Sequence, residues 1–188
     1  MPLLVRSKDF ELDFRMNKET LKIFVTVGSR NYPFDRLFKK LDELCEEGVI
    51  KGEMFAQTGT SVYQPKHYEY KDFISQDEFL EKVKWADIVV SHGASGSIMK
   101  ALNEGKKVIA VTRLAKYGEH INNHQIQNNK AFAHNRYVVA VYEMEELGKA
   151  FEAYYNDTDG TRPWLNKDPL SIVKMIDDFI QENDANEK

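Results

Sequence analysis

The chain has 188 residues, 42% of them apolar and 12% aromatic, a composition that fits a globular domain with a sizeable core and excludes a disordered segment. Its net charge of −4 gives no positive surface field for nucleic acid. The single cysteine, Cys45, excludes an intrachain disulfide, and no apolar run approaches the roughly 20 residues that span a bilayer. We therefore expect a cytoplasmic domain in which Cys45 is a small, buried apolar side chain.

The predicted elements alternate between strand and helix from residue 21 onward. Residues 1–20 differ from the rest of the chain, because Met16 resembles a second start, and we interpret them as a leader or tag-like segment. Ser75 is a predicted helix N-cap, with Glu78 at the capping-box position. In chain order we expect strands at 22–27, 54–57, 68–74, 87–91, 107–111 and 137–142, and helices at 34–47, 76–84, 97–103, 122–133, 144–154 and from 170.

This alternation predicts an α/β domain with a parallel sheet over 21–156, followed by a loop and a C-terminal helix over 157–188. The last helix carries an apolar stripe of Leu170, Val173, Ile176 and Ile180. Two interpretations stay open for it. The stripe packs on its own domain, or it docks a partner together with loop residues Arg113 and Tyr117.

A glycine-rich turn joins the strand at 87–91 to the helix after it. The turn consists of Gly93, Ala94, Ser95, Gly96 and Ser97. Backbone N–H groups at such a helix start have no partner within the helix and favour an anion such as a diphosphate. Because the turn follows a strand and begins a helix, it is a more specific signal for a phosphate site than a glycine-rich turn alone.

Polar or glycine-containing segments come after two further strands. Gly28 and Ser29 end the first strand, and residues 118–125 come after the strand at 107–111. Because ligands of open α/β folds bind at the carboxyl edge of the sheet, these segments are expected to converge on one site.

Five separated segments together resemble the C-terminal domain of family 28 glycosyltransferases. They are the opening 24–29 with Phe34-Asp35, the segment 73–74, the strand and turn 85–97, the strand 104–111 and the Asn-His-Gln run 123–125. The resemblance implies a single Rossmann-like domain, the C-terminal half of a GT-B glycosyltransferase. The length matches the split members of the family, in which a separate membrane-attached subunit supplies the acceptor half. The loop 116–120 makes it most similar to the bacterial subunits of exopolysaccharide or capsule synthesis.

The resemblance also implies roles for individual residues. It implies a UDP-sugar donor, a lipid-linked sugar acceptor and inversion at the anomeric carbon of the sugar, with no required cofactor. It also implies that the partner recruits the chain to the inner face of the membrane. In isolation, we expect that the chain can form a homo-oligomer. We assign catalytic roles to His92, Glu119 and His120, although His92 is equally readable as a structural histidine. The expected donor-binding residues are Gly28, Ser29, Ile74 (whose backbone would read uracil), Gly93, Ala94, Ser95, Gly96, Ser97, Glu104, His124 and Gln125.

The sequence departs from the family pattern at one position. The family places a carboxylate one turn into the helix after the glycine turn, to hold the ribose, and this chain has Lys100 there. Either Glu104 reaches in from the next turn, or Lys100 pairs with phosphate.

His120 and His124 have the i,i+4 spacing of zinc ligands, but no third ligand is adjacent, and we expect no metal. Two other functions stay open, a non-catalytic nucleotide-sugar-binding regulatory module and a stand-alone nucleotide-sugar epimerase or hydrolase.

Overall fold

The computed structural model describes residues 20–121, 124–165 and 170–186. The expected leader at 1–20 therefore lies, except for Thr20, outside the described residues.

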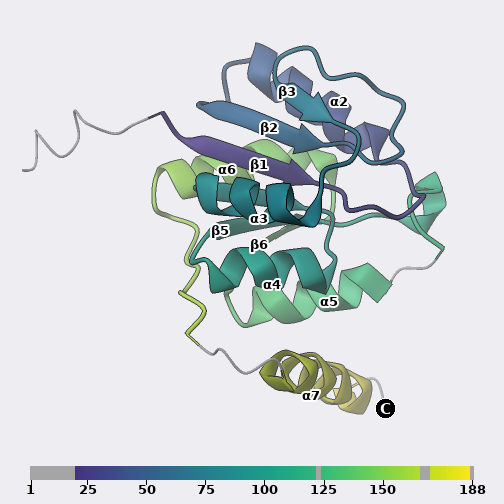
Figure 1. Cartoon of the computed structure of the whole chain (residues 1–188). Helices are drawn as coiled ribbons and strands as arrows, with labels where there is room; N and C mark the ends of the chain where they lie inside the picture. The colour runs from purple at the N-terminus through teal and green to yellow at the C-terminus, as the bar shows by residue number, and fades with distance from the viewer. Residues whose placement is uncertain (1–19, 122–123, 166–169, 187–188) are drawn as a thin grey trace, which may run out of the picture.

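Within the described ranges, six parallel strands form one sheet (Figure 1). The strands are β1 (Lys22–Thr26), β2 (Glu53–Gln57), β3 (Glu69–Lys71), β4 (Ile88–Ser91), β5 (Lys107–Val111) and β6 (Val139–Val141). Their order is β3-β2-β1-β4-β5-β6. The chain thus grows outward from β1 in one direction and then from β4 in the other, which creates a switch point between β1 and β4. Open α/β sheets bind ligands at such a point, outside the carboxyl ends of the strands.

Helices cover both faces of the sheet (Figure 1). They are α2 (Asp35–Glu46), α3 (Gln76–Trp85), α4 (Ser95–Asn103), α5 (His124–His134), α6 (Leu147–Tyr155) and α7 (Leu170–Asn186), with short 3-10 helices η1 (Ala115–Tyr117) and η2 (Met144–Glu146). Side chains of α2 and α6 build the core on one face. Side chains of α3, α4 and α5 build it on the other. Apolar burial on both faces explains why the central strands are continuous apolar runs.

Most predicted elements are confirmed, with changes at their ends. The strand expected at 68–74 is reduced to Glu69–Lys71, because its partner β2 ends at Gln57, which pairs with Lys71. The helix expected at 97–103 begins at Ser95, two residues earlier. Ser75 caps α3 as predicted, and its hydroxyl accepts the N–H of Glu78 at 3.1 Å. Cys45 packs against the core but is only half-buried.

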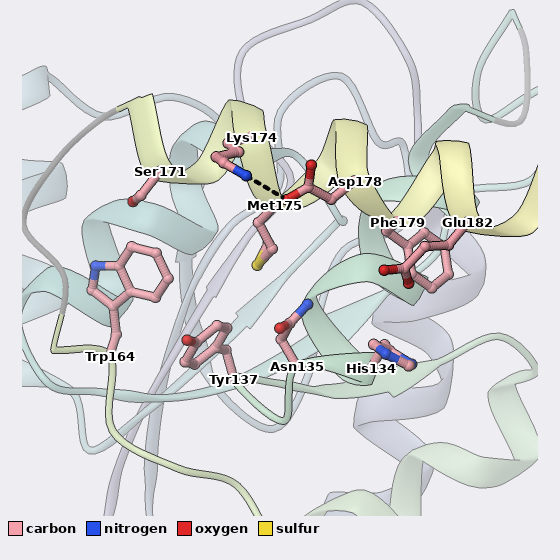
Figure 2. Close-up of a pocket in the computed structure, with 10 residues that line it drawn as sticks. All are labelled: His134, Asn135, Tyr137, Trp164, Ser171, Lys174, Met175, Asp178, Phe179 and Glu182. Atoms are coloured by element: carbon pink, nitrogen blue, oxygen red, sulfur yellow. Dashed lines mark hydrogen bonds and ion pairs between the residues drawn. The ribbon is translucent and has the colours of Figure 1, made fainter.

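The C-terminal helix α7 lies against α5, and the expected stripe is divided between core and solvent. Ile172, Met175 and Ile176 pack on the domain, whereas Leu170 and Val173 are 73% and 56% exposed. Figure 2 shows Met175 pointing from α7 toward Tyr137, beside Trp164. The Tyr137 and Trp164 rings stack edge to face, with centroids 4.8 Å apart. The packing interpretation is therefore correct for one side of α7.

Candidate functional site

A cleft of about 610 Å³ opens at the carboxyl edge of the sheet, at the switch point between β1 and β4. This volume lies within the roughly 300–1,000 Å³ of small-molecule sites. The lining residues come from the ends of β1, β2 and β4, from the starts of α3, α4 and α5, and from the loop after β5. They are Thr26, Gly28, Ser29, Arg30, Gln57, Ile74, Ser75, Gln76, Phe79, His92, Ala94, Ser95, Gly96, Ser97, Lys100, His120, Gln125 and Asn128.

The N-terminus of α4 faces this cleft. The N-cap residue Ala94 makes no side-chain capping bond, so the first N–H groups of the helix are not satisfied by a cap. A Cβ added to Gly96 would meet nothing within 4 Å, so the backbone there borders open space. The Ser97 hydroxyl is held by Ser91 Oγ at 2.7 Å and Ala94 O at 3.0 Å. This arrangement offers a positive helix end to an anion.

Gly93 gives this turn its shape by making room for Asn129. Gly93 has φ +85°, and a Cβ there would lie 2.6 Å from Asn129 Nδ2. Asn129 is fully buried, and its Nδ2 donates to Thr112 Oγ1 at 2.9 Å. Gly93 thus shapes the turn from behind, and it does not line the cleft.

The loop after β1 forms the opposite wall. Gly28 has φ +71°, and a Cβ there would lie 2.9 Å from His92 Cε1. Its N–H donates to Thr26 Oγ1 at 3.2 Å, and Thr26 Oγ1 donates to Gln57 Oε1 at 2.8 Å. These bonds fix the end of β1, so a non-glycine residue at 28 would be both strained and obstructed.

His92 lies at the cleft floor as a neutral imidazole. Its Nδ1 donates to the carbonyl oxygen of Thr26 at 3.3 Å, because a carbonyl can only accept. Burial, reinforced by the positive charge of Arg113, lowers the pKa of His92 to about 3. Nε2 is therefore a hydrogen-bond acceptor at neutral pH and too weak a base for efficient proton transfer.

Gln125 brings an unpaired acceptor to the cleft. The residue is 9% exposed, and its Oε1 is buried with no hydrogen-bond partner in the described chain. A buried amide oxygen without a partner is costly, and a ligand hydroxyl would satisfy it. His120 lines the same side, with its ring centroid 5.2 Å from that of Tyr32. The side chain of His124 lies outside the described residues.

Lys100, and not Glu104, occupies the position one turn beyond the glycine turn. Lys100 lines the cleft, and its Nζ is 5.0 Å from the centre of the Phe79 ring. Glu104 comes after the last residue of α4 and is exposed. At 1.5 Å per residue it lies roughly 13 Å along the helix from Ser95, and it is not among the residues that line the cleft.

Glu119 is likewise absent from the cleft lining, because its carboxylate is engaged elsewhere. Oε1 and Oε2 accept from Arg36 Nε at 2.7 Å and Arg36 Nη2 at 2.9 Å. Oε2 also accepts the N–H of Leu114 at 2.9 Å. Glu119 is 3% exposed and fastens the loop after β5 to α2. The geometry favours this structural role over the expected catalytic one.

The structure brings most of the predicted site residues together. Ten of them line the cleft: Gly28, Ser29, Ile74, His92, Ala94, Ser95, Gly96, Ser97, His120 and Gln125. Sequence reasoning missed Arg30, Gln57 and Phe79. Arg30 comes three residues after the predicted strand at 22–27, and Gln57 is the last residue of the predicted strand at 54–57. Their positions at strand ends could have indicated that both lie at the carboxyl edge of the sheet. The sequence pattern around Phe79 indicates only an apolar position of a helix that faces the core, and it gives no signal for a binding site.

Comparison with known proteins then identifies the family. The model of the glycosyltransferase family 28 C-terminal domain matches residues 22–160. The chain belongs to this family. A mouse UDP-N-acetylglucosamine transferase subunit, ALG13, is 27% identical over 115 residues, which cover 56% of this chain and 9% of the mouse protein. The chain thus spans only about a tenth of the curated relative that it matches.

Solved structures of glycosyltransferases share the fold of this family 28 domain. An NMR structure of ALG13 aligns with a TM-score of 0.59 and 20% identity, over 84% of this chain and 96% of that one. The glycosyltransferase of kitacinnamycin aligns with a TM-score of 0.55 and 15% identity, over 87% of this chain and 38% of that one. A UDP-glucose:anthocyanidin 3-O-glucosyltransferase, solved with UDP, aligns with a TM-score of 0.54 and 14% identity, over 96% of this chain and 40% of that one. This family 28 domain therefore has the fold of one half of a GT-B glycosyltransferase, as predicted.

None of the helices in the described ranges combines the length and hydropathy that a membrane span requires.

Proposed function

We propose that the cleft between β1 and β4 binds a UDP-sugar and that the chain is the donor-binding catalytic subunit of a two-subunit inverting glycosyltransferase. One observation carries this proposal. A single cleft combines the uncapped start of α4, suited to a diphosphate, with the unpaired Gln125 Oε1, suited to a sugar hydroxyl. The similarity to ALG13 supports the same conclusion.

The proposed reaction is a direct displacement at the anomeric carbon. The acceptor hydroxyl oxygen forms the new C–O bond as the bond to the β-phosphate oxygen breaks, and UDP leaves with the electron pair. The start of α4 and the cations Arg30 and Lys100 stabilise the charge that develops on UDP. UDP-sugar is the donor substrate, and no further cofactor is proposed.

The acceptor proton needs a base other than His92 or Glu119. His92 is neutral with a depressed pKa, and Glu119 is ion-paired outside the cleft. Among the described lining residues, His120 is the other imidazole side chain, and imidazole is a common general base in enzymes. We propose that His120, or a group of the acceptor-binding subunit, takes the proton.

We further propose that a membrane-anchored subunit holds a lipid-linked acceptor over the cleft and recruits this chain to the membrane from the cytoplasmic side. Exposed apolar side chains in the loops at the carboxyl edge support a partner there. Val62 is 82% exposed, Tyr117 53% and Ile121 74%. Exposed apolar side chains at one edge of a domain are typical of an interaction surface.

Calorimetry tests the nucleotide assignment. UDP and UDP-sugars should bind more tightly than ADP or GDP, because the proposed site reads uracil as well as phosphate. Equal affinity for ADP and UDP contradicts the assignment. A transfer assay with the co-expressed partner then separates a catalytic subunit from a regulatory module, which would bind donor without turnover. Turnover of a soluble nucleotide-sugar by the chain alone would instead indicate an epimerase or hydrolase.

A further inference from the structure

Arg113 carries a guanidinium group into the interior behind the cleft. The residue lies just beyond the end of β5 and is 1% exposed. Its Cζ lies 5.4 Å from the centre of the Phe34 ring. The described part of the chain provides it with no ion pair to a carboxylate. One interpretation of the sequence placed Arg113 on a docking surface. Because the residue is buried, it is unable to contribute to such a surface.

The hydrogen bonds of Arg113 hold both ends of the loop after β1. Nη2 donates to the carbonyl oxygen of Val27 at 3.0 Å and to that of Tyr32 at 2.8 Å. Residues 28–31 lie between these two carbonyls, and Gly28, Ser29 and Arg30 line the cleft. One nitrogen thus fixes the wall that faces the start of α4.

The charge of Arg113 is not balanced locally. Glu119 lies close enough to act on Arg113 electrostatically, but its two oxygens are bonded to Arg36 and to the N–H of Leu114. Two guanidinium groups therefore share one carboxylate. Burial lowers the pKa of Arg113 to about 10, which leaves it protonated at neutral pH.

The cleft itself adds no negative charge. Its described lining residues include the cations Arg30 and Lys100 and no aspartate or glutamate, although acidic residues outnumber basic ones, 30 to 26, in the whole chain. A buried cation without its own counter-ion is costly to a folded protein. Such a cost is expected where an anionic ligand completes the charge balance.

We propose that Arg113 is a positioning residue for the diphosphate of the donor. It shapes the 28–31 segment from behind, and it gives the cleft floor a positive charge that bound diphosphate neutralises. Arg113 itself does not touch the ligand. This inference rests on the proposed function, which it deepens by assigning part of the diphosphate stabilisation to a residue outside the cleft.

Two substitutions test the charge and the shape separately. Arg113→Gln removes the charge and keeps a donor, whereas Arg113→Lys keeps the charge without the planar guanidinium. We expect Arg113→Gln to weaken UDP binding about tenfold and uridine binding less than about twofold, with a smaller loss of UDP affinity for Arg113→Lys. Arg162→Gln is the matched control, because Arg162 Nε also donates to a backbone carbonyl, that of Asn135 at 2.8 Å, but away from the cleft.

A second readout needs no ligand. The charged groups acting on the His92 ring are Arg113, His120 and Arg30. Removal of the Arg113 charge should raise the midpoint at which His92 protonates in NMR spectra, whereas Arg113→Lys should leave it nearly unchanged. A purely structural role for Arg113 does not predict this difference between the two variants.

The outcomes separate this inference from the proposed function. Should Arg113→Gln bind UDP as tightly as wild type, or lose UDP and uridine affinity equally, the positioning role is wrong. If Arg113→Gln does not fold, the ratio of UDP to uridine affinity in Arg113→Lys decides the question, because a positioning role predicts a loss for UDP that uridine does not share. A folded wild-type chain that fails to bind UDP overturns the proposed function, and the His92 titration still reports whether Arg113 sets the charge of the cleft.

Discussion

Arg36 and Glu119 form a two-point ion pair that joins α2 to the loop after β5, with distances of 2.7 Å and 2.9 Å. The side chains are 22% and 4% exposed. Residues 113–120 carry Arg113 and His120, so this pair holds in place the loop that supplies both. The relationship explains why an acidic residue beside a predicted active-site histidine does not itself face the cleft.

The first prediction is that Glu119→Gln lowers stability more than it changes chemistry. The substitution weakens a charge-assisted bond in a largely buried site and should cost about 1.5–3 kcal/mol of unfolding free energy. Urea denaturation measures it. Asp178→Asn is the control, because the Lys174–Asp178 pair is 76% and 54% exposed and should contribute at most about 0.5 kcal/mol. A fully stable Glu119→Gln variant that loses transfer activity contradicts the structural assignment and restores a catalytic role.

The second prediction concerns Gly96. Gly96→Val should abolish UDP binding in a folded protein, because the new side chain enters the open space at the start of α4. Gly96 is not among the glycines with positive φ, so steric blockage, and not backbone strain, causes the loss. Gly96→Ala adds one carbon only and should reduce affinity less. Calorimetry with UDP decides it, and affinity within about twofold of wild type in a folded Val variant excludes this turn as the phosphate site.

The third prediction assigns Gln125 to the sugar. Gln125→Ala should reduce affinity for UDP-sugar by about 0.5–1.5 kcal/mol and leave affinity for UDP nearly unchanged, because the unpaired Oε1 is assigned to a sugar hydroxyl. Gln127→Ala, at an exposed position of the same helix, is the control. An equal loss for UDP and UDP-sugar reassigns Gln125 to the nucleotide.

The fold could be predicted from the sequence because its signals are local. Apolar runs such as Ile23 to Val27 are buried on both faces, and Ser75 marks a helix start that the structure confirms. Edge elements were less well predicted, since the length of β3 depends on where β2 ends. That length is set by pairing between strands and not by the residues of β3 alone.

The candidate site was predictable where residues lie at strand ends and helix starts, as for Gly28, Ser95 and Gln125. It was not predictable where a side chain's partner is distant in sequence. Glu119 lies 83 positions from Arg36, and Arg113 lies 86 from Val27. No local pattern indicates that the first is ion-paired or that the second is buried behind the cleft.

The fourth prediction rests on the depressed pKa of His92. In the unfolded chain His92 protonates near 6.5, whereas in the folded protein burial and Arg113 delay protonation until about pH 3. Between these values the unfolded state binds the extra proton, so His92 makes stability fall as pH falls, by about 1.4 kcal/mol per pH unit. At pH values well above 6.5, His92 is neutral in both the folded and the unfolded state, and it then adds nothing to the pH dependence of stability.

Urea denaturation at several pH values between about 4.5 and 6.5 measures this slope. His92→Asn should be less pH-dependent than wild type over the same window, whatever its absolute stability. Asp42 and the other histidines remain in both proteins, so the difference between the slopes isolates His92. Identical slopes would show that His92 is not held neutral in the folded state.

The last prediction concerns the exposed side of α7. Removal of the whole C-terminal segment from Arg162 is a poor test of docking, because Trp164 packs on Tyr137 and Arg162 Nη2 donates to Tyr137 Oη at 3.0 Å. Leu170→Asp with Val173→Asp changes only exposed side chains and should alter stability by less than about 0.5 kcal/mol per site. If α7 docks the proposed membrane subunit, the double variant should bind UDP normally and no longer sediment with membranes of cells that express both chains. Val62→Asp tests the partner surface proposed above, since Val62 lies in a loop at the carboxyl edge and is 82% exposed. Loss of sedimentation in Val62→Asp alone places the partner over the cleft and leaves α7 with a packing role only.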